Sequence, residues 1–138
     1  MPKLSLPWLY HALAVSQALH SIEEVLTSLW AWMPRVTAVW HEEIDWIPLM
    51  QGMGETKFAA ANLVIVTILL ALTPFVFERR SWALALAFWI AVLEIANGSG
   101  HFLGALLVRG YFPGVLAGLG LILFGVLYVR QFLMERKV

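Results

Sequence analysis

Residues 58–77 read FAAANLVIVTILLALTPFVF, a run that contains no charged side chain. An apolar run of about 20 residues is long enough to cross the hydrocarbon core of a bilayer as one α-helix. Runs of similar character lie at about residues 6–30, 82–107 and 113–133. The sequence therefore predicts an all-α integral membrane protein, in which residues 1–138 form a single transmembrane four-helix bundle.

The composition agrees with this class. The chain has 138 residues, of which 61% are hydrophobic and only 13% are Asp, Glu, Lys or Arg. A soluble domain usually carries about a quarter charged residues. The formal net charge is zero, so nothing indicates a nucleic-acid partner, and the absence of cysteine excludes disulfides and thiolate metal sites.

The connections between the spans predict the orientation of the bundle. With four spans, both termini and the connection near residue 80 lie on one side of the membrane, and that side carries more lysine and arginine than the other. The positive-inside rule therefore predicts that both termini are cytoplasmic. Residues 33–57 combine tryptophans with an acidic patch, which is typical of the membrane–water boundary, and we expect them to form an interfacial loop.

Two clusters of polar residues interrupt the predicted spans. Ionisable side chains at membrane depth are costly and mark a functional site by default. At about 100° per residue, one face of the first span carries Gln17, His20, Glu23, Glu24 and Thr27. A stripe on the third span carries Glu94, Asn97 and His101. His20 to Glu24 and Asn97 to His101 fall in the outer half of the bilayer, and Glu94 lies nearer the middle. We therefore expect the two clusters to meet inside the bundle.

These two clusters predict a metal site. They contain no lysine or arginine, and adjacent unpaired carboxylates in a low-dielectric bundle either protonate or need a cation. A divalent metal is the simplest solution, with His20, Glu24, Glu94 and His101 as its ligands. Oxygen and imidazole ligands suit Zn, Fe or Mn, and the ligand set allows one ion or two. The alternative is that the carboxyls stay neutral and are hydrogen-bonded for packing.

The remaining polar residues receive roles around this metal. Glu23 is predicted to be a general base, or a ligand if a second ion binds. Glu24 and Glu94 are catalytic candidates as well as ligands. Asn97 and Gln17 are expected to contribute to cofactor binding by orienting the ligands through hydrogen bonds.

Other features are architectural. Gly114, Gly118 and Gly125 form a small-residue stripe on the fourth span, a pattern that permits close helix approach. Residues 109–114 are typical of a tight turn with an aromatic anchor. Thr27 is expected to bond to its own helix backbone instead of joining the site.

Motifs in three segments carry a family resemblance. They are His20-Ser21-Ile22-Glu23-Glu24, the pair Asn97 and His101, and the turn Tyr111-Phe112-Pro113-Gly114. With these motifs the sequence resembles a family of small bacterial integral membrane proteins named for an HXXEE motif. The resemblance implies a location in the inner membrane of a bacterium, and it implies site roles for His20, Glu23, Glu24, Asn97 and His101. The role of that family is not established, so the resemblance names no reaction.

The leading functional hypothesis is a metal-dependent membrane enzyme that acts on a lipid or isoprenoid-like substrate. A metal held by His and Glu lowers the pKa of bound water to about 7 and polarises a carbonyl or phosphoryl oxygen, so hydrolysis is the simplest reaction. Oxidation by a non-haem di-iron centre is the second reaction class, because the Glu and His residues come close to the ligand set of di-iron bundles.

Other functions stay open. A metal-free isomerase or cyclase of the sterol or isoprenoid type would use a protonated glutamate and aromatic side chains that stabilise a carbocation. Haem ligated by His20 and His101 is a further possibility, but Glu23 and Glu24 would flank it and make a poor apolar pocket. A transporter would need a continuous polar path, which the inner half of the spans lacks apart from His11. An accessory subunit of a larger membrane complex, or a homo-oligomer, is also compatible with so short a chain.

Overall fold

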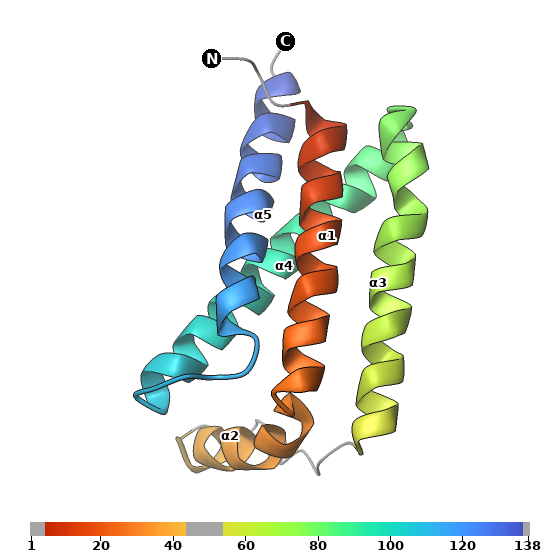
Figure 1. The fold of residues 1–138 in the computed structure, drawn as a ribbon. Helices are drawn as coiled ribbons and strands as arrows, with labels where there is room; N and C mark the ends of the chain where they lie inside the picture. The colour runs from red at the N-terminus through yellow and green to blue at the C-terminus, as the bar shows by residue number, and fades with distance from the viewer. Residues whose placement is uncertain (1–4, 44–53, 137–138) are drawn as a thin grey trace.

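The computed structural model describes residues 5–43 and 54–136. Within these residues all regular structure is α-helical, and the helices are α1 (Leu6–Leu26), α2 (Leu29–Glu43), α3 (Glu55–Phe77), α4 (Ser81–Leu107) and α5 (Val115–Glu135) (Figure 1). The predicted all-α class is therefore confirmed.

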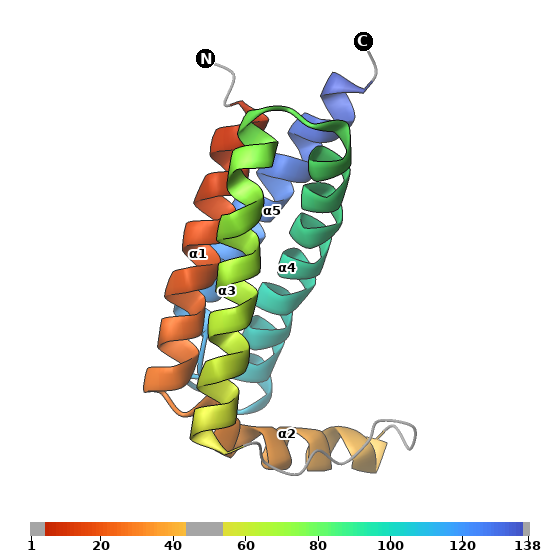
Figure 2. The ribbon, with the colours of Figure 1, turned by 90° about the vertical axis from the view of Figure 1, so that its right-hand side faces the viewer.

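The four long helices form the body of the molecule, and α2 lies across one end of it. α1 packs against α5 and α3, and α4 packs mainly against α5. The start of α1, the α3–α4 turn and the end of α5 lie together at the end opposite α2 (Figures 1 and 2). At that end Arg79 of the α3–α4 turn pairs with Glu135 of α5, with 2.8 Å between Nη2 and Oε2.

Three helices are long and apolar enough to cross a membrane, by length and composition. α3, α4 and α5 have 23, 27 and 21 residues, with stretches whose mean hydropathies are 2.3, 1.5 and 1.8. α1 also has 21 residues, but its polar residues, among them His20, Glu23 and Glu24, lower its hydropathy and it does not belong to this set. Of the four predicted spans, three are thus supported among the described residues.

The first long helix is shorter than predicted. The expected span covered about residues 6–30, but α1 ends at Leu26, and Ser28 adopts a left-handed conformation with φ of 58°. An α-helix cannot continue through that conformation. The Thr27 hydroxyl donates to the carbonyl oxygen of Glu23 at 2.6 Å, which confirms its predicted bond to its own helix backbone.

The expected loop over residues 33–57 is wrong where the chain is helical, in residues 33–43 and 55–57, while its interfacial position stays a prediction. The segment is helical through Glu43 as part of α2, and α3 already begins at Glu55. Leu29 and Thr37, two turns apart, are both buried, so packing of one face of α2 stabilises the helix. Residues 44–53, which include part of the predicted acidic patch, lie outside the described residues.

Small residues let α4 and α5 approach closely. A Cβ added to Gly98 would lie 2.5 Å from the carbonyl oxygen of Gly118, and one added to Gly125 would lie 3.0 Å from the carbonyl oxygen of Ala91. The close approach predicted from the glycines of the fourth span is therefore confirmed. Because α5 packs against both α1 and α4, it holds these two helices on either side of the site.

We expect Gly98→Ala to destabilise the protein by about 1–3 kcal/mol, because the new Cβ would overlap the backbone of α5. Gly100→Ala is the matched control, because a Cβ at Gly100 has nothing within 4 Å, and this change should be neutral or slightly stabilising. The free energies of unfolding of both variants in detergent micelles test this. Equal stability of the two variants would contradict the close α4–α5 contact.

Candidate metal centre

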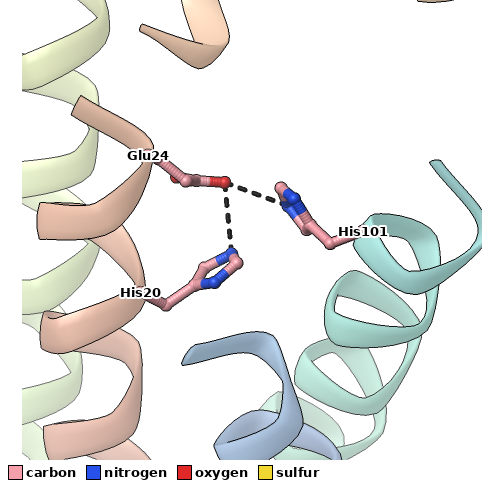
Figure 3. A group of neighbouring side chains, drawn as sticks. All are labelled: His20, Glu24 and His101. Carbon is pink, nitrogen blue, oxygen red and sulfur yellow. Dashed lines mark ion pairs between the residues drawn. The ribbon is translucent and has the colours of Figure 1, made fainter. Parts of the chain in front are cut away.

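His20, Glu24 and His101 converge near the end of the bundle that α2 crosses. His20 and Glu24 are four residues apart and therefore share a face of α1, and His101 reaches them from α4 (Figure 3). Oε1 of Glu24 lies 3.1 Å from Nε2 of His20 and 3.0 Å from Nε2 of His101. One ligand atom from each residue lies within 4.8 Å of the others, and all three side chains are buried. This group can hold one metal ion.

The chemistry of the donor set fits a cation. Neither α1 nor α4 contains lysine or arginine. Among the described residues neither ring nitrogen of His20 has a hydrogen-bond partner, although both are buried and Nε2 lies 3.1 Å from Oε1 of Glu24. A buried nitrogen left in this state is costly, and coordination would satisfy it. Ligands of a tetrahedral zinc ion with bonds of about 2.0–2.1 Å lie about 3.3 Å apart. The two distances from Oε1 of Glu24 to the histidine nitrogens, 3.1 and 3.0 Å, are close to this value.

The turn that joins α4 to α5 orients His101. Nδ1 of His101 lies within hydrogen-bond distance of the carbonyl oxygen of Pro113. A carbonyl oxygen only accepts, so Nδ1 carries the proton and donates. In the neutral ring, Nε2 then presents a lone pair 3.0 Å from Oε1 of Glu24, an arrangement that a cation between the two atoms would stabilise. Metal-bound histidines usually donate their second ring N–H in this way, which fixes the tautomer and the ring orientation.

Gly114 leaves room for both imidazoles. It precedes the first residue of α5 and has a φ of 85°, in the left-handed region that favours glycine. A Cβ at Gly114 would lie 2.7 Å from Nδ1 of His101 and 2.7 Å from Cε1 of His20. The two rings meet edge to face, with their centroids 4.5 Å apart and an interplanar angle of 87°. Glycine is therefore needed here both for its conformation and for its missing side chain.

Glu23 lies apart from the histidines, against the N-terminus of α5. Its Oε1 accepts hydrogen bonds from the Tyr111 hydroxyl at 2.7 Å and the Leu116 N–H at 3.2 Å, and its Oε2 accepts one from the Ala117 N–H at 2.7 Å. Adjacent residues on a helix point about 100° apart, so Glu23 and Glu24 meet different partners. Glu23 is not part of the close ligand group, and its role as a general base stays a prediction.

Glu94, Asn97 and Gln17 are near neighbours whose predicted roles stay predictions. Glu94 is buried on α4 but is not a member of the close ligand group. The Asn97 side chain donates to Oε2 of Glu94 at 3.4 Å, so it orients this carboxyl and not a histidine. Gln17 donates to the Ser21 hydroxyl at 3.1 Å, while its Oε1 is buried without a partner in the described structure. The residues described hold no second close ligand group for a second ion.

The sequence does not reveal the part played by residues 112–114. A Pro-Gly pair beside an apolar run indicates a turn, and the sequence predicts one here, but not that its backbone reaches the site. The Phe112 ring packs beside the His101 ring, with centroids 5.7 Å apart, and it lies directly over Gly104. Which side chain the Pro113 carbonyl meets depends on how α4 and α5 cross, and no local pattern encodes that crossing.

Comparison with known proteins points to a family. The model of a protein family described as "Protein of unknown function with HXXEE motif" matches residues 11–129, a range that includes His20, Glu24 and His101. The resemblance read from the motifs is therefore confirmed. No curated protein and no solved structure matches the chain.

Proposed function

The chain belongs to the HXXEE family, whose function is unknown, and we propose that it is a metal-dependent integral membrane enzyme acting on a lipid-soluble substrate. The observation that carries this proposal is the buried group of His20, Glu24 and His101, which offers two imidazole nitrogens and a carboxylate oxygen to one ion. Such ligands suit Zn, Fe or Mn. Hydrolysis is the simplest reaction, and oxidation at an iron centre is the second.

In this proposal α1 is the fourth membrane-spanning helix, and both termini are cytoplasmic. The large exposed side chains of α1 are all apolar, and they are Trp8, Val15, Leu19, Ile22 and Leu26. His20 and Glu24, in contrast, are buried. An apolar outer face and a polar inner face suit a helix that lies in lipid against other helices. The site then occupies the outer half of the inner membrane of a bacterium, at a depth that a substrate dissolved in the bilayer can reach.

The side chains divide the chemistry between them. A divalent ion bound here would lower the pKa of a water molecule to about 7 and polarise a carbonyl or phosphoryl oxygen of the substrate. His20, Glu24 and His101 hold it. Glu94 takes the acid–base role, because it is buried on the same stripe of α4 as His101, and the hydrogen bond that it accepts from Asn97 is long, at 3.4 Å. Glu23 is a poorer base, because hydrogen bonds already occupy both of its oxygens.

A groove between α1 and α3 supports a substrate with a hydrocarbon chain. It has a volume of about 340 Å³ and is lined by apolar side chains of both helices, with Ser21 and Asn62 as its polar members. Ser21 follows His20 directly and accepts a hydrogen bond from Gln17. A lipid chain in this groove would therefore lie alongside the segment of α1 that carries the site.

Turnover of lipids tests the proposal. The purified protein is placed in nanodiscs, loaded with zinc, and incubated with a panel of ester and phosphoester lipids in water that carries heavy oxygen. We expect the heavy oxygen to appear in the released acid or phosphate. Glu94→Gln should lose this turnover and keep its metal, because Glu94 lies outside the ligand group. A product that requires iron and dioxygen instead would assign the oxidative reaction. The absence of product with either metal would contradict an enzymatic function.

A further inference from the structure

We infer that Glu23 is a positioning residue for the metal centre: it fixes the turn between α4 and α5, and this turn fixes His101. The inference rests on the proposed function, because it assigns Glu23 a purpose in metal binding. The two adjacent glutamates of the HXXEE motif then have different roles. Glu24 faces the ion, and Glu23 holds the backbone that orients the second histidine.

The Glu23 carboxylate contacts the first turn of α5. The residue that caps the start of α5 is Gly114, which has no side chain to accept from the first N–H groups of the helix. The Glu23 carboxylate from α1 takes this place, because it accepts from the N–H groups of Leu116 and Ala117 at 3.2 and 2.7 Å. Hydrogen bonds to an ionised carboxylate are strong, and a negative charge is favourable at a helix N-terminus. Glu23 therefore anchors the first turn of α5 to α1.

Glu23 also holds the turn between α4 and α5 from both sides. It accepts from Leu116 after the Pro113–Gly114 pair and from the Tyr111 hydroxyl before it, at 2.7 Å. Burial and the hydrogen bond to Glu23 raise the pKa of Tyr111, so its hydroxyl keeps the proton that it donates. The segment between these two contacts cannot shift without breaking one of them.

The turn that Glu23 holds contacts both histidines. The Pro113 carbonyl accepts from Nδ1 of His101, and Gly114 packs directly against the rings of both His101 and His20. If Glu23 is removed, the turn is free to move and the Nδ1–H of His101 loses its fixed acceptor. The tautomer with the proton on Nε2, which cannot coordinate through Nε2, then becomes accessible. Loss of such a supporting contact typically weakens metal binding by about 10- to 100-fold.

Nitrogen-15 NMR of histidine in the metal-free, full-length protein tests the inference. In the wild type we expect the neutral His101 ring to carry its proton on Nδ1, and in Glu23→Ala we expect a mixture of tautomers. The same variant should bind zinc about 10- to 100-fold more weakly. Glu135→Gln is the matched control. It removes a carboxylate that pairs with Arg79 at the far end of α5, so it should leave the tautomer and the zinc affinity unchanged.

A pure Nδ1–H tautomer of His101 in Glu23→Ala, with wild-type zinc affinity, would overturn the inference. If that variant does not fold, Tyr111→Phe decides, because it removes one of the two contacts that bracket the turn and leaves the bonds from Glu23 to α5. It should give a smaller change of the same kind, and no change in either readout would refute the positioning role. Because the tautomer is measured without metal, a wild type that binds no zinc would contradict the proposed function while the NMR result still decides this inference.

Discussion

Glu24→Gln is expected to abolish tight metal binding. Oε1 of Glu24 is the atom that both histidines share, at 3.1 and 3.0 Å, and its carboxylate is the negative charge in the ligand group. The apparent free energy of zinc binding in structural sites is about 10–16 kcal/mol, so the loss of one ligand of three removes about 3–5 kcal/mol. That corresponds to an affinity lower by a factor on the order of hundreds to thousands.

Zinc titration against a chromophoric chelator measures this effect. Glu94→Gln is the control, because Glu94 is also a buried glutamate but lies outside the ligand group. It should bind zinc as the wild type does. If the two variants lose zinc affinity equally, the ion is held by a larger set of carboxylates than the three-residue group.

Gly114→Ala is expected to damage both the fold and the site. An alanine in the left-handed conformation costs roughly 1–2 kcal/mol, and its Cβ would lie 2.7 Å from atoms of both His101 and His20. The two rings cannot both keep their positions, so we expect a lower free energy of unfolding together with zinc binding weaker by at least about tenfold.

Gly110→Ala is the matched control for this change. It lies in the same turn, but the nearest atom to its added Cβ is 3.8 Å away, and its φ is not positive. Thermal unfolding and zinc titration of the two variants form the test. A Gly114→Ala variant with the stability and zinc affinity of Gly110→Ala would show that the turn does not press against the imidazoles.

The helical framework could largely be predicted from the sequence. Runs of apolar residues mark α3, α4 and α5 directly, because their mean hydropathy is high, even in α4, which also carries Glu94, Asn97 and His101. The end of α1 and the start of α2 could not be predicted in this way. Apolar residues continue across Ser28, whose left-handed conformation breaks the helix, and the hydropathy of Leu29 and Trp30 gives no sign of the break.

The three candidate metal ligands could be predicted from the sequence for a different reason. His20, Glu24 and His101 are polar residues where lipid would exclude them, and helical periodicity places the first two on one face. The different partners of Glu23 and Glu24 could not be predicted from the sequence. They depend on the position of the α5 N-terminus relative to α1, which is set by long-range packing, as is the meeting of His101 with Pro113.

Elemental analysis of the protein purified from its membrane tests the central claim most directly, that His20, Glu24 and His101 together hold a metal ion. We predict close to one transition-metal ion per chain in the wild type, because the residues that the structure describes contain one close ligand group. The double variant His20→Ala/His101→Ala, prepared in parallel, should contain almost none. A wild-type protein without stoichiometric metal, or a double variant with the same metal content as the wild type, would contradict the claim.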